Sequence, residues 1–250
     1  MNSISQSFST AFSFIASGDS ALWAIVARSL WVSGVATLLA SGLGVLLGAW
    51  LAVGRFGGRG GVLALLNTML AIPSVVVGLL VYLMLSRSGP LGYLGWLFSV
   101  KAMILAQALL VLPIVAALTR QLVEDADVLH GEQLQSLGAG SFIRAALHVW
   151  DERFAVLMVL LAAFGRAIAE VGAVMVVGGN IDGFTRVMTT AIALETSKGD
   201  LPLALGLGLV LLAVVLLLNA LVAGVKAALG RSSSGLRVLS GSAKGEGVRL

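Results

Sequence analysis

The chain has 250 residues, of which 58% are hydrophobic and 11% are charged, and its mean hydropathy is +1.03. Soluble domains carry about 25% charged residues, so this composition excludes a water-soluble enzyme. The sequence contains no cysteine, which excludes disulfides, thiol catalysis and metal sites with cysteine ligands. The pI near 10.0 would suit nucleic-acid binding, but no basic cluster with interleaved aromatic residues is present. We therefore expect an integral membrane protein that binds no nucleic acid.

Long stretches without Asp, Glu, Lys or Arg divide the chain. They cover residues 29–54, 60–86, 102–119 and 201–225. Roughly 20 helical residues cross the hydrocarbon layer of a bilayer, so each stretch is long enough to span it. A further apolar segment carries Arg166 and Glu170 in its interior. The pattern predicts an all-α polytopic protein whose membrane domain, residues 21–228, has five transmembrane spans at about 29–53, 62–86, 102–118, 154–177 and 203–225.

Basic residues are distributed unequally among the segments between these spans. If the segments after spans one, three and five are cytoplasmic, ten Lys and Arg lie inside, at positions 55, 59, 120, 144, 153, 226, 231, 237, 244 and 249. Five lie outside, at positions 28, 87, 101, 186 and 198. Cytoplasmic loops are enriched in Lys and Arg, so we expect the N-terminus outside and the C-terminus inside.

The two ends of the chain differ from the spans in composition. In residues 1–20, Phe8, Phe12 and Ile15 recur at helical spacing among polar residues, which is typical of an amphipathic segment on the outer membrane surface. An unstructured leader explains the same residues equally well. Residues 229–250 are basic and rich in Gly and Ser, which predicts a flexible cytoplasmic tail.

Residues that could carry enzymatic chemistry are few. The phosphate-binding pattern G-x-x-x-x-G-K-[ST] is absent, so we expect the chain to bind neither ATP nor Mg²⁺ itself. His130 and His148 have no second ligand at metal-binding spacing, and we expect both to be solvated surface residues. No catalytic nucleophile arrangement is recognisable. The sequence therefore favours a protein that moves a substrate rather than one that converts it.

The polar segment 120–153 holds the strongest local signal. Gly138 interrupts a helical pattern, and glycine tolerates the backbone angles of a sharp turn, so the segment can present a helix to the cytoplasm as a docking surface. Residues 132–144 resemble the E-A-A-x-x-x-G motif of ATP-binding-cassette importer permeases, with Gln133 and Leu134 in place of the two alanines. The resemblance implies contact with an ATPase through Glu132, Ser136, Leu137, Gly138, Ala139, Gly140, Phe142 and Arg144.

Three further stretches narrow the resemblance. Residues 72–78 resemble the proline-containing span of molybdate, tungstate and sulfate permeases. Residues 166–174 are similar to the Arg…Glu-Phe-Gly-Ala segment of molybdate-type permeases, and 178–200 looks most like tungstate permeases. The resemblance implies a type I importer in the cytoplasmic membrane of a bacterium or archaeon. Such an importer contains two permease chains, ATPase subunits that bind ATP and Mg²⁺, and an external oxyanion-binding protein.

The resemblance leaves several roles open. Arg166 and Glu170 either form a structural ion pair or belong to the translocation pathway or its gate. The other candidates for the pathway or gate are Pro73, Gly78 and Gly172. A stripe of small residues either packs helices or lines a hydrophilic path; its members are Ser29, Ser33, Thr37, Ser41, Gly44 and Gly48.

Three polar residues stand at the predicted outer surface. Asn180, Asp182 and Arg186 either meet the binding protein or form a helix-breaking loop. The resemblance implies that two copies of this chain form the pathway for an oxyanion, which we expect to be tungstate. Molybdate or sulfate import, and gradient-driven transport, are the alternatives.

Overall fold

A computed structural model describes residues 9, 13 and 16–242, with side chains through residue 224. Every regular element among these residues is a helix, which confirms the all-α prediction. The chain divides into two compact units, Met1–Leu212 and Ala213–Leu250. Phe8, Phe12 and Ile15 lie outside the described residues, so the amphipathic N-terminal segment stays a prediction.

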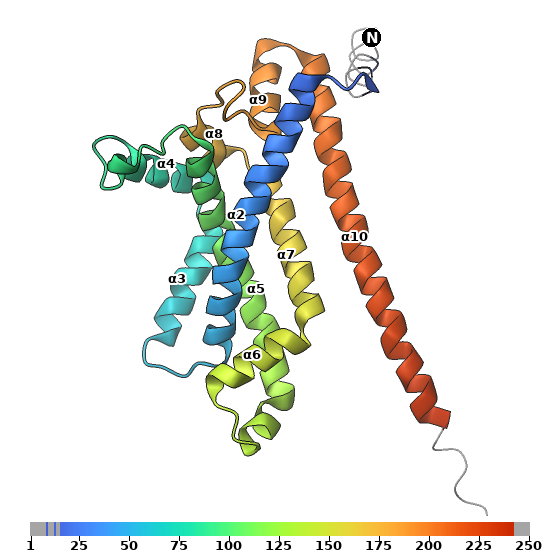
Figure 1. Cartoon of the computed structure of the whole chain (residues 1–250). Helices are drawn as coiled ribbons and strands as arrows, with labels where there is room; N and C mark the ends of the chain where they lie inside the picture. The colour runs from blue at the N-terminus through green and yellow to red at the C-terminus, as the bar shows by residue number, and fades with distance from the viewer. Residues whose placement is uncertain (1–8, 10–12, 14–15, 243–250) are drawn as a thin grey trace, which may run out of the picture. The chain divides into compact units, whose positions relative to one another are not determined.

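Helices α2, Ser20–Val53, and α5, Val100–Ser136, form the central pair of the first unit (Figure 1). A Cβ atom at Gly48 would lie 2.4 Å from the Ala116 carbonyl oxygen, and one at Gly44 would lie 2.9 Å from the Val115 side chain. Small residues let helix backbones approach this closely in membranes. The whole stripe of small residues on α2, from Ser29 to Gly48, is buried, which confirms the packing interpretation.

The predicted second span is two helices rather than one. Helix α3, Arg59–Ala71, and helix α4, Ser74–Leu85, meet at an angle of 103°. Pro73 separates them because it has no backbone N–H and restricts the preceding Ile72, which is extended at φ −67° and ψ 129°. The apolar run 62–86 is therefore two helices that meet at the proline, and the two together count as one span if the bent pair crosses the membrane.

The predicted fourth span is also broken. Helix α7, Arg153–Ile168, and helix α8, Gly172–Gly178, meet at 58°. Helix α8 crosses α4 closely, since a Cβ atom at Gly78 would lie 2.7 Å from the Ala173 Cα atom. A core cluster that includes Val81, Met103 and Val174 fills the space where α4, α5 and α8 meet.

The segment 120–153 is helical and not a loop. Helix α5 continues to Ser136, well beyond the predicted end of the third span at residue 118, and helix α6, Ser141–Asp151, follows after a short turn. At its other end α5 is preceded by a short 3₁₀ helix, Gly92–Leu94.

The last two helices are α9, Met188–Lys198, and α10, Leu201–Ser242. Helix α10 extends past residue 225, the predicted end of the fifth span, so residues 229–242 are helical where the sequence predicted a flexible tail. An established helix adds residues at little cost, and no proline interrupts this one after Pro202.

Within the described residues, three helices are long and apolar enough to cross a membrane. They are α2, α5 and the 201–224 part of α10, and the number rises to five if each bent pair is one span.

The first prediction concerns the crossing of α4 and α8. Gly78→Ala should lower the stability of the protein by roughly 1–3 kcal/mol because the added methyl group must displace the α8 backbone. Gly42→Ala is the matched control, since nothing lies within 4 Å of a Cβ atom at Gly42. Thermal unfolding of the purified variants in detergent tests this expectation, and equal melting temperatures for the two would contradict it.

Candidate functional site

The turn between α5 and α6 has the geometry predicted from Gly138. This residue has φ +82°, a left-handed conformation that favours glycine. The Ala139 N–H donates to the Leu134 carbonyl oxygen at 3.0 Å, and the Leu137 N–H donates to that of Gln133 at 3.3 Å. These bonds satisfy carbonyl groups at the end of α5, so the chain can reverse and begin α6 two residues later.

The face of α6 that packs on α5 is polar. An Arg144 nitrogen, Nη1, donates to both carboxylate oxygens of Asp127, at 2.9 and 3.2 Å. The His148 Nε2 atom lies 3.1 Å from Asp127 Oδ1, and it carries the hydrogen because an ionised carboxylate only accepts. A Cβ atom at Gly131 would lie 2.6 Å from Asp127 Oδ1, so any larger residue there would displace the Asp127 carboxylate. Asp127 thus attaches α6 to α5.

This joint corrects two expectations from the sequence. His148 is 1% exposed, so the prediction that it is a solvated surface residue is wrong, whereas His130 is exposed as predicted. Arg144 is 8% exposed and turned toward α5, so its side chain does not belong to the outer face of α6. The sequence analysis missed Asp127, because its partners lie 17 and 21 residues away in a polar stretch with other charges.

The opposite face of α6 and the end of α5 expose large apolar side chains. Leu137 is 78% exposed and Phe142 is 81% exposed. Further members of this apolar face are Val128, Leu129, Ile143 and Trp150. Among the other residues proposed for docking, Glu132, Ser136, Gly138 and Gly140 are exposed and Ala139 is half-buried. The amphipathic helix α6 therefore points its apolar side outward, which is typical of an interaction surface.

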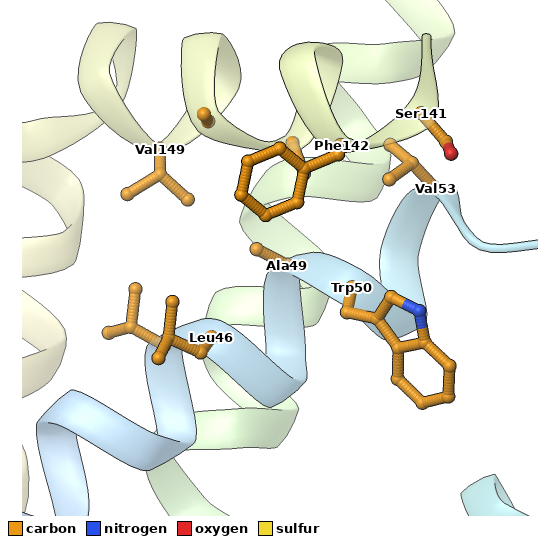
Figure 2. A pocket seen from close by; sticks show the side chains of 10 residues that line it. Leu46, Ala49, Trp50, Val53, Ser141, Phe142 and Val149 are labelled. Atoms are coloured by element: carbon orange, nitrogen blue, oxygen red, sulfur yellow. The ribbon is translucent and has the colours of Figure 1, made fainter.

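A groove of about 450 Å³ lies between α6 and the last turns of α2. Figure 2 shows Phe142 and Val149 of α6 facing Leu46 and Ala49 of α2 across this groove. Its lining is apolar apart from Ser141. Helix α6 is thus joined to α5 through ion pairs, whereas toward α2 it offers only small or apolar side chains.

A second polar group lies at the break between α7 and α8. An Arg166 nitrogen, Nη1, donates to Glu170 Oε2 at 2.7 Å, and the Ala173 N–H donates to Glu170 Oε1 at 3.2 Å. The Thr189 hydroxyl donates to the Glu170 carbonyl oxygen at 2.7 Å. The Glu170 side chain is 3% exposed but that of Arg166 is 46% exposed. Glu170 therefore bonds residues on both sides of the break, while Arg166 keeps an open side.

The pathway candidates and one further residue surround this group. Gly172 packs against α4, since a Cβ atom there would lie 2.6 Å from Val75, and Pro73 is exposed at the start of α4. Gln107 is 3% exposed, and its amide nitrogen donates to the Ala167 carbonyl oxygen at 3.0 Å. Gln107 was missed from the sequence, although an amide in the apolar run 102–119 was a usable signal.

The predicted outer residues belong to a bonded loop. Arg186 lies 3.2 Å from Asp182 and 3.9 Å from Glu195, and its side chain is 16% exposed. Asn180 adopts a left-handed conformation and donates to the Thr190 carbonyl oxygen at 3.3 Å. Arg28 of α2 donates to the carbonyl oxygens of Gly183 and Arg186. Only Asp182, at 78% exposure, offers most of its side chain to solvent.

The structure is that of a multi-pass membrane protein. It has long apolar helices, a charged pair inside a broken span and a protruding α5–α6 end. No family model matches the chain, but individual proteins do. The Tungstate uptake system permease protein TupB of Peptoclostridium acidaminophilum is 38% identical over 226 residues, 89% of this chain and 97% of the relative. The Probable anion ABC transporter permease protein of Haloferax volcanii is 42% identical over 205 residues, 80% and 88% of the two chains. The Molybdenum transport system permease protein ModB of Escherichia coli is 31% identical over 194 residues, 71% and 82%.

The matches cover 97%, 88% and 82% of the three relatives' own lengths. The chain belongs to the permeases of anion ATP-binding-cassette transporters, of the type that serves tungstate and molybdate. It is a transport subunit and not an enzyme.

The second prediction concerns the joint between α5 and α6. Asp127→Asn should destabilise α6 by about 2 kcal/mol, because Arg144 remains buried without its counter-charge. Hydrogen exchange in residues 137–151 should become faster by at least tenfold. Asp125→Asn is the matched control, since Asp125 is exposed on the same helix and has no ion pair in the described part of the chain. Unchanged exchange in Asp127→Asn would contradict the joint.

The third prediction separates the two functions of Glu170. The double variants Arg166→Leu/Glu170→Gln and Arg166→Leu/Glu170→Leu are both uncharged, but only the first keeps an oxygen that can accept from the Ala173 N–H. A buried N–H without a partner costs roughly 1–3 kcal/mol, so the Gln variant should be the more stable by that amount. Thermal unfolding in detergent measures the difference. Equal stabilities would mean that Glu170 contributes to stability only through its charge.

Proposed function

We propose that the chain forms the membrane pathway of an ATP-driven importer for tungstate. The observation that carries the proposal is the apolar face of α6, which stands exposed on a helix that Asp127 fixes to a long membrane helix. The relative named for tungstate uptake matches 97% of its own length at 38% identity, against 82% at 31% for the one named for molybdenum transport. In this proposal a separate ATPase binds ATP and Mg²⁺, an external binding protein delivers tungstate, and the chain itself binds no cofactor.

The proposed topology has five spans in residues 21–228, with the N-terminus outside and the C-terminus inside. Each bent pair then counts as one span, and residues 1–20 lie at the outer surface. The ten-to-five distribution of basic residues supports this orientation. Contacts between these residues also support it. Arg59 and Arg120, both assigned inside, share Glu124, and Arg28 and Arg186, both assigned outside, meet at the other end.

The proposed ATPase contact is the exposed part of the α5–α6 end. It comprises Glu132, Ser136, Leu137, Gly138, Ala139, Gly140 and Phe142. Arg144 serves this contact indirectly, because its ion pair with Asp127 orients α6. A push on Phe142 therefore reaches α5 through a charged joint rather than through a flexible loop.

The proposed outer contact is with the binding protein. Asp182 supplies the exposed charge for it, and Asn180 and Arg186 hold the loop through their bonds to Thr190, Asp182 and Glu195. We also propose that two copies of the chain form the pathway between them. A single copy leaves the Arg166 side chain 46% exposed within a span, and an arginine facing lipid there costs roughly 2.5–3.5 kcal/mol or more.

The fourth prediction tests the proposed function in proteoliposomes. Tungstate uptake should require the chain, its ATPase, the binding protein and ATP together, and the chain alone should transport none with or without an ion gradient. Gradient-driven uptake by the isolated chain would make it a secondary carrier. If the complex takes up molybdate but no tungstate, even with tungstate-loaded binding protein present, then molybdate and not tungstate is the substrate.

The same prediction includes the docking surface. Phe142→Asp should weaken ATPase binding at least tenfold, because it places a charge in the apolar contact. The fold should remain, since the Phe142 side chain is 81% exposed. Tyr93→Asp is the matched control, because Tyr93 is equally exposed at the opposite end of α5. Equal binding by the two variants would move the contact away from α6.

A further inference from the structure

We propose that Arg166 is a contact point for the oxyanion inside the membrane, and that Glu170 weakens this contact so that the anion passes on. The inference rests on the proposed function, since it names the part of the pathway that meets the substrate. The substrate class is a tetrahedral dianion such as tungstate. Within the two-copy pathway, the Arg166 residues of both chains would face the passing ion.

The first argument is the unequal burial of the pair. Glu170 is closed in, at 3% exposure, with its two carboxylate oxygens bonded to Arg166 and to the Ala173 N–H. Arg166 uses one nitrogen for this bond and remains 46% exposed. A guanidinium group carries five N–H donors, and in the described residues no other acceptor takes one from Arg166. The pair therefore presents unused donors on the open side and hides its acceptor.

The second argument is the surroundings of the open side. Ala162 and Ala169 stand four residues before and three residues after Arg166, and both are exposed on α7. The bulky exposed side chains Phe154 and Leu157 project from other sides of α7. The neighbours of Arg166 on its own side of the helix are therefore small. A helix face that only contacted lipid would not need an arginine with an alanine on each side of it.

The third argument is the buried amide next to the pair. Gln107 lines a small cleft together with Arg166 and Glu170. Its amide oxygen is buried and has no hydrogen-bond partner among the described residues. Buried polar atoms are rarely left without a partner, so this oxygen is a free acceptor next to the pair. Arg166 lines the same cleft, and we propose that its guanidinium donates to this oxygen when an anion draws it away from Glu170.

The chemistry of the pair suits transit rather than storage. A guanidinium fork matches two oxygens of a tetrahedral anion, and a lone arginine in a dry span would hold a dianion strongly. Glu170 neutralises most of that attraction, because it stands 2.7 Å from the guanidinium. The anion therefore meets directed N–H donors with little net charge behind them, which gives a weak and reversible contact.

The absence of cysteine permits a direct test. In the assembled complex, Ala162→Cys and Ala169→Cys should react with a negatively charged methanethiosulfonate reagent, and tungstate-loaded binding protein with ATP should change the rate at least threefold. Ala163→Cys is the matched control, because Ala163 is 0% exposed on the same helix and should not react. If only an uncharged maleimide labels the two exposed positions, the Arg166 face meets lipid and the inference is wrong.

Transport by Arg166 variants completes the test. Arg166→Gln should lower tungstate uptake about tenfold, the loss expected for one charged hydrogen bond, while binding-protein docking and ATPase stimulation stay normal. Arg166→Lys should restore most uptake, and Arg87→Gln, in an exposed loop, should have no effect. Normal uptake by a folded Arg166→Gln complex would overturn the inference. Absence of tungstate uptake by the unaltered complex would instead overturn the proposed function.

Discussion

A glutamate that bonds three neighbours inside a membrane segment, two through its carboxylate and one through its backbone carbonyl oxygen, determines the arrangement of the broken span. Where α7 stops at Ile168, backbone groups lose their helical partners, and no water is available in hydrocarbon to replace them. Glu170 accepts from the first turn of α8 and from Arg166, and its carbonyl oxygen accepts from Thr189. The break is thus stabilised by one residue, and α8 and α9 take their positions from it.

The consequences of this break extend to the other broken span. With α8 turned by 58° from α7, Ala173 reaches the α4 backbone at Gly78, and Gly172 reaches the start of α4 at Val75. Helix α4 is turned by 103° from α3 at Pro73. The two bent pairs therefore pack against each other through their short helices. If either bent pair were one straight helix, the short helix of the other pair would lose the surface on which it packs.

Much of this could be read from the sequence, and the misses have physical causes. The hydropathy pattern located the end of α2 at Val53 and the existence of every apolar segment, because hydropathy depends on composition alone, but α2 begins at Ser20, nine residues before the predicted start. The sharp angles at Pro73 and Glu170 were not predicted, since a hydropathy window does not record backbone direction. The joint at Asp127 was missed because an ion pair depends on distance in space, and the segment holds several carboxylates at similar spacing. Gly138 was found because its turn is local, and its φ of +82° is a property of one residue.

Helix α5 connects the polar group around Asp127 with the one around Glu170. Asp127, near one end, holds α6, and Gln107, 20 residues earlier, holds the α7 backbone at Ala167 beside Arg166. At a rise of ~1.5 Å per residue this separation is roughly 30 Å, the thickness of the hydrocarbon layer. Pro113 interrupts the hydrogen bonding of the helix between them. A displacement of α6 therefore travels along one continuous helix to the break between α7 and α8, and the proline is the place where that helix bends most easily.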